Sequence, residues 1–147
     1  MAGWCIRDAE LNDAPELAVL MCELGYQTDR TEMETRLELV LLNPAYKTFV
    51  AIMGGSVCGM IGALTYPSYE HNDGSGRILA LVTSSTARRR GIGRALIATA
   101  EKDFEQRGIR RVSLDTRLTR EDAHKFYQLL GYERNGWRFL KQLPVSN

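Results

Sequence analysis

The sequence lacks the features of a membrane-spanning protein, of a secreted protein and of a zinc-binding protein. It has no run of about 18 apolar residues, and its first residues contain no apolar stretch like that of a secretion signal. Only three cysteines occur, widely spaced and without a Cys-x-x-Cys pair, which argues against a disulfide framework and against zinc binding. We therefore expect a cytoplasmic protein with buried thiols, no metal site and no membrane contact.

The sequence also lacks an excess of basic or of acidic residues. The 147 residues include 19 Lys or Arg and 18 Asp or Glu, which gives a formal net charge of +1. Nucleic-acid binding depends on a broad basic surface, so this balance argues against a nucleic-acid partner. The length fits one domain over residues 1–147, and 44% hydrophobic residues suffice for one core.

A basic turn with two glycines is the most informative stretch that the sequence does contain. The apolar, β-rich residues 77–83 predict a buried strand, and residues 92–106 carry apolar side chains at helical spacing. Glycines let a ligand approach the backbone, the first N–H groups of a helix attract phosphate, and arginines add charge-assisted hydrogen bonds. A site for a ligand with several phosphates is therefore predicted at Arg88, Arg89, Arg90, Gly91, Ile92, Gly93 and Arg94.

Two other phosphate-binding loops fit this turn less well. No Gly-Lys-Ser/Thr follows it, as a P-loop nucleotidase requires. Leu96 occupies the position where a dinucleotide fingerprint has its third glycine. A solvated basic turn that merely begins a helix is the plain alternative.

Two motifs carry a resemblance to a known family. Arg88-x-x-Gly91-x-Gly93 after a strand resembles the acetyl-CoA pyrophosphate loop of the GCN5-related N-acetyltransferases (GNAT). Ala123-x-x-Phe126-Tyr127, followed by Gly131-Tyr132, resembles the Ala-x-x-Phe-Tyr-x-x-x-Gly-Phe/Tyr motif of the same family. The resemblance implies an enzyme that uses acetyl-CoA as acetyl donor, with an amine attacking the thioester directly.

The resemblance also implies roles for individual residues. A backbone N–H at a bulge in the central strand, at Leu81 or Val82, would polarise the thioester carbonyl. Together with Thr83 and the residues of the basic turn, these form the expected cofactor site. Tyr127 would protonate the leaving thiolate, since a phenol of pKa ~10 can donate to a thiolate of pKa ~8.5. The alternative is that Tyr127 only packs in the core beside Phe126.

Three positions depart from the family pattern. Ala80 stands where many members carry a glutamate that acts as general base, Ser85 where proline is common, and Arg120 where an asparagine often contacts the cofactor. The first departure leaves deprotonation of the amine unassigned. A water chain is one candidate for this step, and the others are side chains in or beside loops: Glu70, His71, Asp73 and Asp115.

Periodicity and capping residues predict an α/β (α+β) fold with a mixed central sheet flanked by helices, as in the GNAT fold. Asp13 with Glu16, Thr31 with Glu34, and Thr119 with Asp122 are predicted helix starts, and Gly25, Gly108 and Gly131 are predicted helix ends. The last strand would offer an edge for a homodimer. The predicted strands are residues 4–7, 46–53, 57–66, 77–83, 111–115 and 137–141.

The acceptor is narrowed by a further resemblance. Cys22-Glu23-Leu24 and the residues 138–141, among others, resemble the aminoalkylphosphonate N-acetyltransferases and their small-amine relatives. This implies a small-molecule amine, and it leaves aminoglycosides, amino acids and peptide N-termini open. The alternatives are an acetyltransferase acting on a peptide or protein amine and, because of Ala80, a non-catalytic regulatory domain that binds acetyl-CoA.

Overall fold

The computed structural model describes residues 3–116 and 121–145, and their contacts divide the chain into two compact units, Met1–Leu114 and Asp115–Asn147. The strands lie in the first unit and are β1 (Trp4–Asp8), β2 (Tyr46–Met53), β3 (Ser56–Tyr66), β4 (Ser75–Thr83) and β5 (Val112–Leu114). They form one sheet in the order β1-β2-β3-β4-β5. Neighbours are antiparallel except for β4 and β5, which are parallel.

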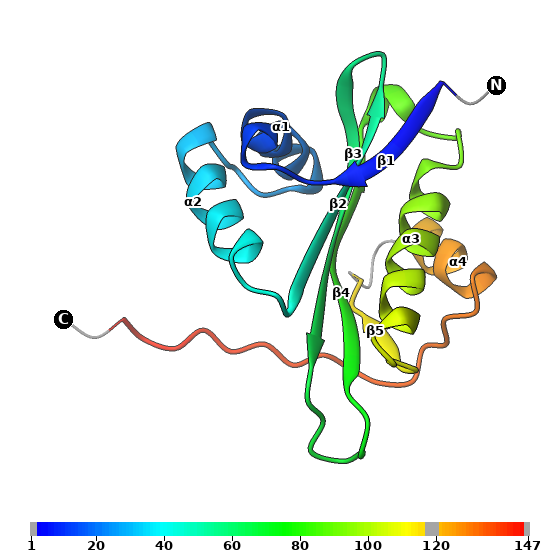
Figure 1. The fold of residues 1–147 in the computed structure, drawn as a ribbon. Helices are drawn as coiled ribbons and strands as arrows, with labels where there is room; N and C mark the ends of the chain where they lie inside the picture. Colours follow the sequence, from blue (N-terminus) through cyan, green and yellow to red (C-terminus); the bar gives the residue numbers. More distant parts are fainter. Residues whose placement is uncertain (1–2, 117–120, 146–147) are drawn as a thin grey trace. The chain divides into compact units, whose positions relative to one another are not determined.

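Helices cover both faces of this sheet. The helices α1 (Ala14–Leu24) and α2 (Arg30–Leu41) lie on one face, and α3 (Ile92–Gln106) lies on the other, as Figure 1 shows. Two 3-10 turns, η1 (Leu11–Asp13) and η2 (Ser85–Ala87), lead into α1 and out of β4. The predicted fold class, a mixed sheet flanked by helices, is confirmed, and the bounds of β2 and α3 are those that the sequence predicts.

In the second unit the structure describes α4 (Glu121–Leu129). Its predicted cap, Thr119, lies outside the described residues. The predicted glycine end is confirmed, because Gly131 has a left-handed φ of 93°. The Tyr132 N–H donates to the Tyr127 carbonyl at 3.0 Å, which satisfies one of the last carbonyls of the helix.

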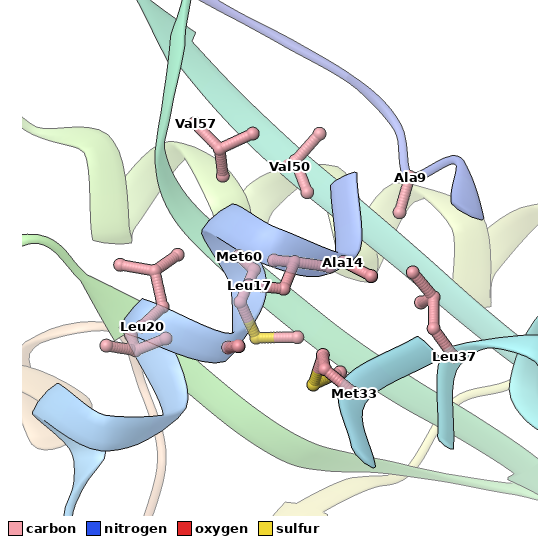
Figure 2. Packing of buried hydrophobic residues seen from close by; sticks show 11 residues of the cluster. Ala9, Ala14, Leu17, Leu20, Met33, Leu37, Val50, Val57 and Met60 are labelled. Atoms are coloured by element: carbon pink, nitrogen blue, oxygen red, sulfur yellow. The ribbon is translucent and has the colours of Figure 1, made fainter. Parts of the chain in front are cut away.

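The space between the sheet and the pair α1–α2 is filled by aliphatic side chains (Figure 2). Leu17 is fully buried and Leu37 is 1% exposed. Burial of a large aliphatic side chain contributes about 1.5–3 kcal/mol, so this layer holds both helices on the sheet. The α1–α2 cluster comprises Ala9, Ala14, Leu17, Ala18, Leu20, Met33, Leu37, Val50, Val57, Met60 and Val82.

On the opposite face, glycines let α3 approach the sheet closely. A Cβ on Gly59 would lie 3.2 Å from side-chain atoms of Ile92 and Leu96, and a Cβ on Gly76 would lie 2.6 Å from the Phe104 ring. Gly59 pairs with the last residue of β4, so the contact with Ile92 fixes the start of α3 beside the end of β4. The buried residues of α3 follow the predicted helical spacing: Ile92, Leu96, Ile97, Ala100 and Phe104.

A β-bulge interrupts β4. The pairing register shifts between Gly62 and Ala63 of β3, which leaves Leu79 as the additional residue in β4. The bulge therefore lies before Leu81 and Val82, and the prediction that it falls at one of these two residues is wrong. An additional residue in a strand changes neither composition nor hydrophobicity, so its position is decided by pairing with β3.

The bulge exchanges the faces to which β4 side chains point. Gly76, before the bulge, faces α3. After the bulge, Val82 and Ala80 pack against the α1–α2 cluster, although an unbroken alternation would put them on the face of Gly76. Ala80 thus presents a methyl group to the α1–α2 side, where the family pattern has a carboxylate.

The start of α2 differs from its prediction. Asp29 accepts a hydrogen bond from the Glu32 N–H at 2.8 Å, and the Glu32 side chain accepts from the Asp29 N–H at 3.0 Å. The predicted capping box of Thr31 and Glu34 is wrong, and Glu34 instead pairs with Arg30 at 2.9 Å. Two overlapping boxes fit the sequence, and aspartate is a better N-cap than threonine.

Asp13 occupies the predicted N-cap position of α1, but its buried carboxylate does not cap the helix. It is 4% exposed and accepts hydrogen bonds from the Arg7 guanidinium at 2.8 and 2.9 Å and from the Glu10 N–H at 2.8 Å. Its side chain makes no cap bond to α1, so the predicted pairing of Asp13 with Glu16 at the start of this helix is wrong. Hydrogen bonding to Arg7 lowers the pKa of Asp13, against the opposing effect of burial.

Asp13→Asn is expected to lower the free energy of unfolding by about 1–3 kcal/mol at neutral pH, because a buried bond to a charged group is lost. The folded pKa of Asp13 lies below the unfolded value of ~3.9, so this contribution is complete above about pH 4. It is lost as the pH falls through the folded pKa. Urea unfolding at pH 7 and pH 3 should show the difference between variant and wild type shrinking in acid.

Asp8→Asn is the matched control, since Asp8 is two-thirds exposed and pairs with Lys47 at the surface at 3.1 Å. Exposed pairs contribute less than about 1 kcal/mol. A variant Asp13→Asn as stable as the wild type at pH 7 would contradict the structural role of the Arg7 pair.

The predicted last strand, residues 137–141, is wrong. In the part of the chain that the structure describes, residues 133–145 belong to no strand. Alternating apolar residues do not make a strand unless a neighbouring strand takes up its backbone hydrogen bonds. The large apolar side chains of this segment are exposed: Trp137, Phe139, Leu140, Leu143 and Val145.

The cysteines differ from one another in burial. Cys58 is buried, and burial raises the pKa of its thiol, whereas Cys5 and Cys22 are exposed. The expectation of buried thiols is therefore confirmed for Cys58 and wrong for the other two. Among residues 3–116 and 121–145, no group of three histidine, cysteine or acidic side chains could hold a metal ion, and no helix is long and apolar enough to cross a membrane.

Candidate cofactor site at the start of α3

The sheet opens between β4 and β5. The two strands pair only over residues 76–78 and 112–114, and β5 is shorter than the predicted 111–115. Residues 79–83 of β4 continue beside β3 but, among the described residues, pair with no strand on the other side. Beyond the bulge, β4 therefore offers a backbone edge that leads directly into the basic turn.

The predicted strand residues of the site lie on this edge. The Val82 side chain is 7% exposed and packs in the α1–α2 cluster, so only its backbone is available to a ligand. Thr83 pairs with Gly59, whose missing side chain faces α3. Leu81 pairs with Ile61 and is partly buried. The structure thus brings Leu81, Val82 and Thr83 to the end of β4.

The connection from β4 to α3 is held at both sides. The Ser84 N–H donates to the Cys58 carbonyl of β3 at 2.7 Å. The Ala87 N–H donates to the Ser84 carbonyl at 2.9 Å, and the Ala87 side chain is fully buried. These contacts fix the backbone position from which the arginine run, beginning at Arg88, continues.

Two residues before α3 adopt the left-handed conformation. Gly91, the N-cap of α3, has a φ of 79°, and Arg89 has a φ of 65°. A Cβ at Gly91 would have no atom within 4 Å, so the backbone there faces open space. Gly91 provides no side-chain cap, which leaves the first N–H groups of α3, from Ile92 to Arg94, available to an external acceptor.

The side chains around this helix start are mostly cationic and solvent-accessible. Arg88, Arg89, Arg90 and Arg94 are exposed, and within the described residues none of them forms an ion pair. Ile92 is 1% exposed, so it can contribute only its N–H. Four exposed arginines within seven residues of chain, next to a helix N-terminus, favour an anion with several phosphates.

The loop before β4 contains three of the candidate bases, Glu70, His71 and Asp73. Arg111 donates to Asp73 at 2.6 Å and lowers the pKa of this carboxyl below its ordinary value. The N–H groups of Glu70 and His71 both donate to Ser68 Oγ at 3.1 Å, in an exposed turn. The lowered pKa makes Asp73 a poor proton acceptor near neutral pH.

Comparison with known proteins identifies the family and the fold. The sequence profile described as the acetyltransferase (GNAT) family matches residues 12–132. The chain belongs to the GNAT acetyltransferase family. This acetyltransferase is also 32% identical over 143 residues to the aminoalkylphosphonate N-acetyltransferase of Salmonella typhimurium, covering 94% of this chain and 90% of the relative.

Solved structures agree with the assignment of the fold. A GNAT family acetyltransferase from Staphylococcus aureus matches with a TM-score of 0.83 and 25% identity over 96% of this chain and 99% of the other. An aminoglycoside N-acetyltransferase in complex with CoA matches with a TM-score of 0.85 and 19% identity, over 97% and 95% of the two chains. The mixed sheet of this acetyltransferase is therefore the GNAT fold.

Enzymes of the GNAT family use an acyl-CoA, and the residues of this acetyltransferase fit such a substrate. CoA carries a pyrophosphate, which suits the unoccupied hydrogen-bonding positions of the first turn of α3 and the neighbouring guanidinium groups. The backbone edge of residues 79–83 lies on the chain immediately before this turn.

Tyr127 of the acetyltransferase lies on α4 in the second unit. Its ring packs edge-to-face on Phe126, with ring centroids 5.3 Å apart, and on Tyr132, with centroids 6.1 Å apart. Asp115, another candidate base, lies in the same unit and is 3.7 Å from Arg138. Arg120, at the position of the family's asparagine, lies outside the described residues.

Sequence reasoning missed the side chains that tie α1 to the rest of the acetyltransferase. Glu16 accepts a hydrogen bond from the Val57 N–H at 2.7 Å, and Glu23 accepts one from the Ser85 N–H at 2.8 Å. Both carboxylates lie on the surface of a helix, where charged residues need no special explanation. Only their contacts with distant backbone groups distinguish them.

Proposed function

We propose that this enzyme transfers the acetyl group of acetyl-CoA to the primary amine of a small molecule, by direct attack of the amine on the thioester. The start of α3 carries the proposal, because uncapped N–H groups follow Gly91 beside four exposed arginines. The proposed catalytic domain is residues 1–147, since the family match runs through both compact units. Acetyl-CoA supplies the activated acetyl group. The protein binds and orients both substrates and protonates the leaving thiolate.

The proposed cofactor contacts divide into two groups. The N–H groups at the start of α3 and the arginines bind the pyrophosphate, while the β4 edge takes up the acetyl end. Tyr127 protonates the leaving thiolate, and water removes the proton of the amine because Ala80 supplies no base. The residues proposed to bind the cofactor are Leu81, Val82, Thr83, Arg88, Arg89, Arg90, Gly91, Ile92, Gly93 and Arg94.

An aminoalkylphosphonate is the acceptor to test first. The supporting observation is the Salmonella typhimurium relative, which aligns over nearly the whole of both chains. Its name specifies an amino group on an alkyl chain that bears a phosphonate, which is an anionic group. We therefore propose a small amine of this class as the substrate of the present enzyme.

The acceptor is tested by following thiol release from acetyl-CoA with four classes of amine: aminoalkylphosphonates, aminoglycosides, amino acids and a short peptide with a free N-terminus. The proposal expects release above the background of hydrolysis with the first class. Release with the peptide alone would replace the small molecule by a peptide acceptor. Tight binding of acetyl-CoA without release with any amine would favour a regulatory domain.

We also propose that the enzyme is a homodimer. The support is a set of five large apolar side chains exposed within residues 137–145, since exposed apolar surface of this kind is typical of interfaces. Sedimentation equilibrium at about 100 μM protein should give twice the mass of the chain, and Trp137→Glu with Phe139→Glu should shift the equilibrium to monomer. A strict monomer for the wild type would refute the dimer.

A further inference from the structure

A hydrogen bond connects α1 with the turn that precedes the proposed pyrophosphate site. Glu23 Oε1, near the end of α1, accepts from the Ser85 N–H at 2.8 Å. Ser85 begins η2, three residues before the first arginine. The two residues are 62 positions apart in the chain, so the bond joins two elements that are otherwise separate in sequence.

The Ser85 N–H has no acceptor within its own turn. In η2, the Thr86 N–H is taken up by the Ser84 side chain and the Ala87 N–H by the Ser84 carbonyl. The Ser84 N–H already donates to Cys58. As the first residue of a helical turn, Ser85 donates outside it, and Glu23 provides the acceptor.

The hydrogen bond from Ser85 to Glu23 is thus a third contact that holds the turn in place, and it attaches the turn to α1. The Ser84 bond fixes it to β3, and the buried Ala87 side chain fixes it to the core. The arginines that follow are exposed and pair with no carboxylate in the described chain, so the turn determines where they begin. A hydrogen bond from a backbone N–H to a side-chain oxygen restricts a short turn of this kind, whether that oxygen belongs to a carboxylate or to an amide.

The backbone also shows how the bond can be removed without changing the turn. Ser84 has φ −54° and ψ 143°, the extended conformation that a residue before proline adopts. Ser85 occupies the first position of a helical turn, where proline fits and where its missing N–H is tolerated. Ser85→Pro therefore deletes the donor while it preserves the local conformation.

We propose that Glu23 is a positioning residue for the acetyl-CoA site, acting through its hydrogen bond to the Ser85 N–H. This inference rests on the proposed function. Glu23 itself touches no substrate in this account; it holds the turn from which the arginines and the uncapped N–H groups of α3 are presented. The property of Glu23 that matters is its acceptor oxygen. Its negative charge does not help binding, since a carboxylate repels phosphate.

The decisive comparison is between Glu23→Ala and Glu23→Gln, with CoA binding measured by calorimetry. Both variants remove the charge, but only glutamine keeps an oxygen that can accept from Ser85. We expect the dissociation constant of CoA to be about 3–10-fold higher for Glu23→Ala than for Glu23→Gln. Equal affinities of the two variants would overturn the proposal.

A second cycle tests whether Ser85 is the partner. In the Ser85→Pro background the N–H is absent, so Glu23→Ala should change CoA affinity by less than about twofold. An undiminished effect of Glu23→Ala in this background would overturn the proposal, because Glu23 would then act by another route.

Glu16→Ala is the matched control, since Glu16 makes the same kind of bond from the same helix to the Val57 N–H. Hydrogen exchange of the Ser85 amide, measured without CoA, should be about tenfold faster in Glu23→Ala and unchanged in Glu16→Ala. An unchanged rate in both variants would show that the bond is not formed in solution. A wild-type protein that does not bind CoA would overturn the proposed function and this inference together, whereas normal wild-type binding with no effect of Glu23→Ala overturns the inference alone.

Discussion

Tyr127→Phe is expected to lower turnover on the order of 10²-fold or more, with little change in the affinity for acetyl-CoA or in stability. Phenylalanine keeps the edge-to-face packing of this ring on Phe126 and Tyr132 and removes only the phenolic hydroxyl. A lost structural hydrogen bond would cost about 1 kcal/mol, which lowers turnover less than tenfold. The two roles of Tyr127 are therefore separated by initial rates measured with a good acceptor.

Tyr132→Phe provides the matched control for this experiment. It removes the hydroxyl of a second tyrosine in the same aromatic cluster, and we propose no part in the reaction for this hydroxyl. We expect Tyr132→Phe to retain turnover within a few-fold of the wild type. Similar losses in both variants, or wild-type turnover in Tyr127→Phe, would return Tyr127 to a packing role.

Gly91→Val is expected to weaken acetyl-CoA binding by at least about tenfold. Its φ of 79° is strained for a β-branched residue, and a side chain there would occupy the open space through which a ligand reaches the N–H groups of α3. The strain itself should lower stability by about 1–2 kcal/mol. Calorimetry with CoA and thermal unfolding measure the two effects separately.

Gly108→Val separates strain from ligand binding. Gly108 has a φ of 78° and open space around its Cβ position, like Gly91, but it lies beyond the other end of α3. The two valine variants should therefore lose similar stability, and only Gly91→Val should lose affinity. Equal CoA affinity in both would remove the helix start from the cofactor site.

Local patterns in the sequence are sufficient to predict much of the first unit. Residues 46–53 are rich in β-forming residues and are followed by Gly54-Gly55, whereas residues 92–106 carry apolar side chains at helical spacing between two arginine-glycine turns. Both elements have the predicted bounds. The basic turn before a helix was also predictable, because a helix start, glycines and positive charge are all local features of the sequence.

Features that depend on distant partners were not predictable. Asp13 has the appearance of an N-cap, but Arg7 engages its carboxylate, and only the folded chain brings the two together around η1. The position of the bulge at Leu79 is decided by the register with β3. Glu23 gave no signal at all, since its partner at Ser85 is a backbone group whose need for an acceptor appears only in the structure.

The central claim, acetyl transfer to a small amine, is tested most directly by quantifying both products of one reaction. The purified protein is incubated with acetyl-CoA and an aminoalkylphosphonate, and N-acetylated amine and free CoA are measured by mass spectrometry. We expect equal amounts of N-acetylated amine and free CoA, formed at a rate that falls sharply in Tyr127→Phe. Free CoA without acetylated amine, or acetyl-CoA left intact across every class of amine, would contradict the claim.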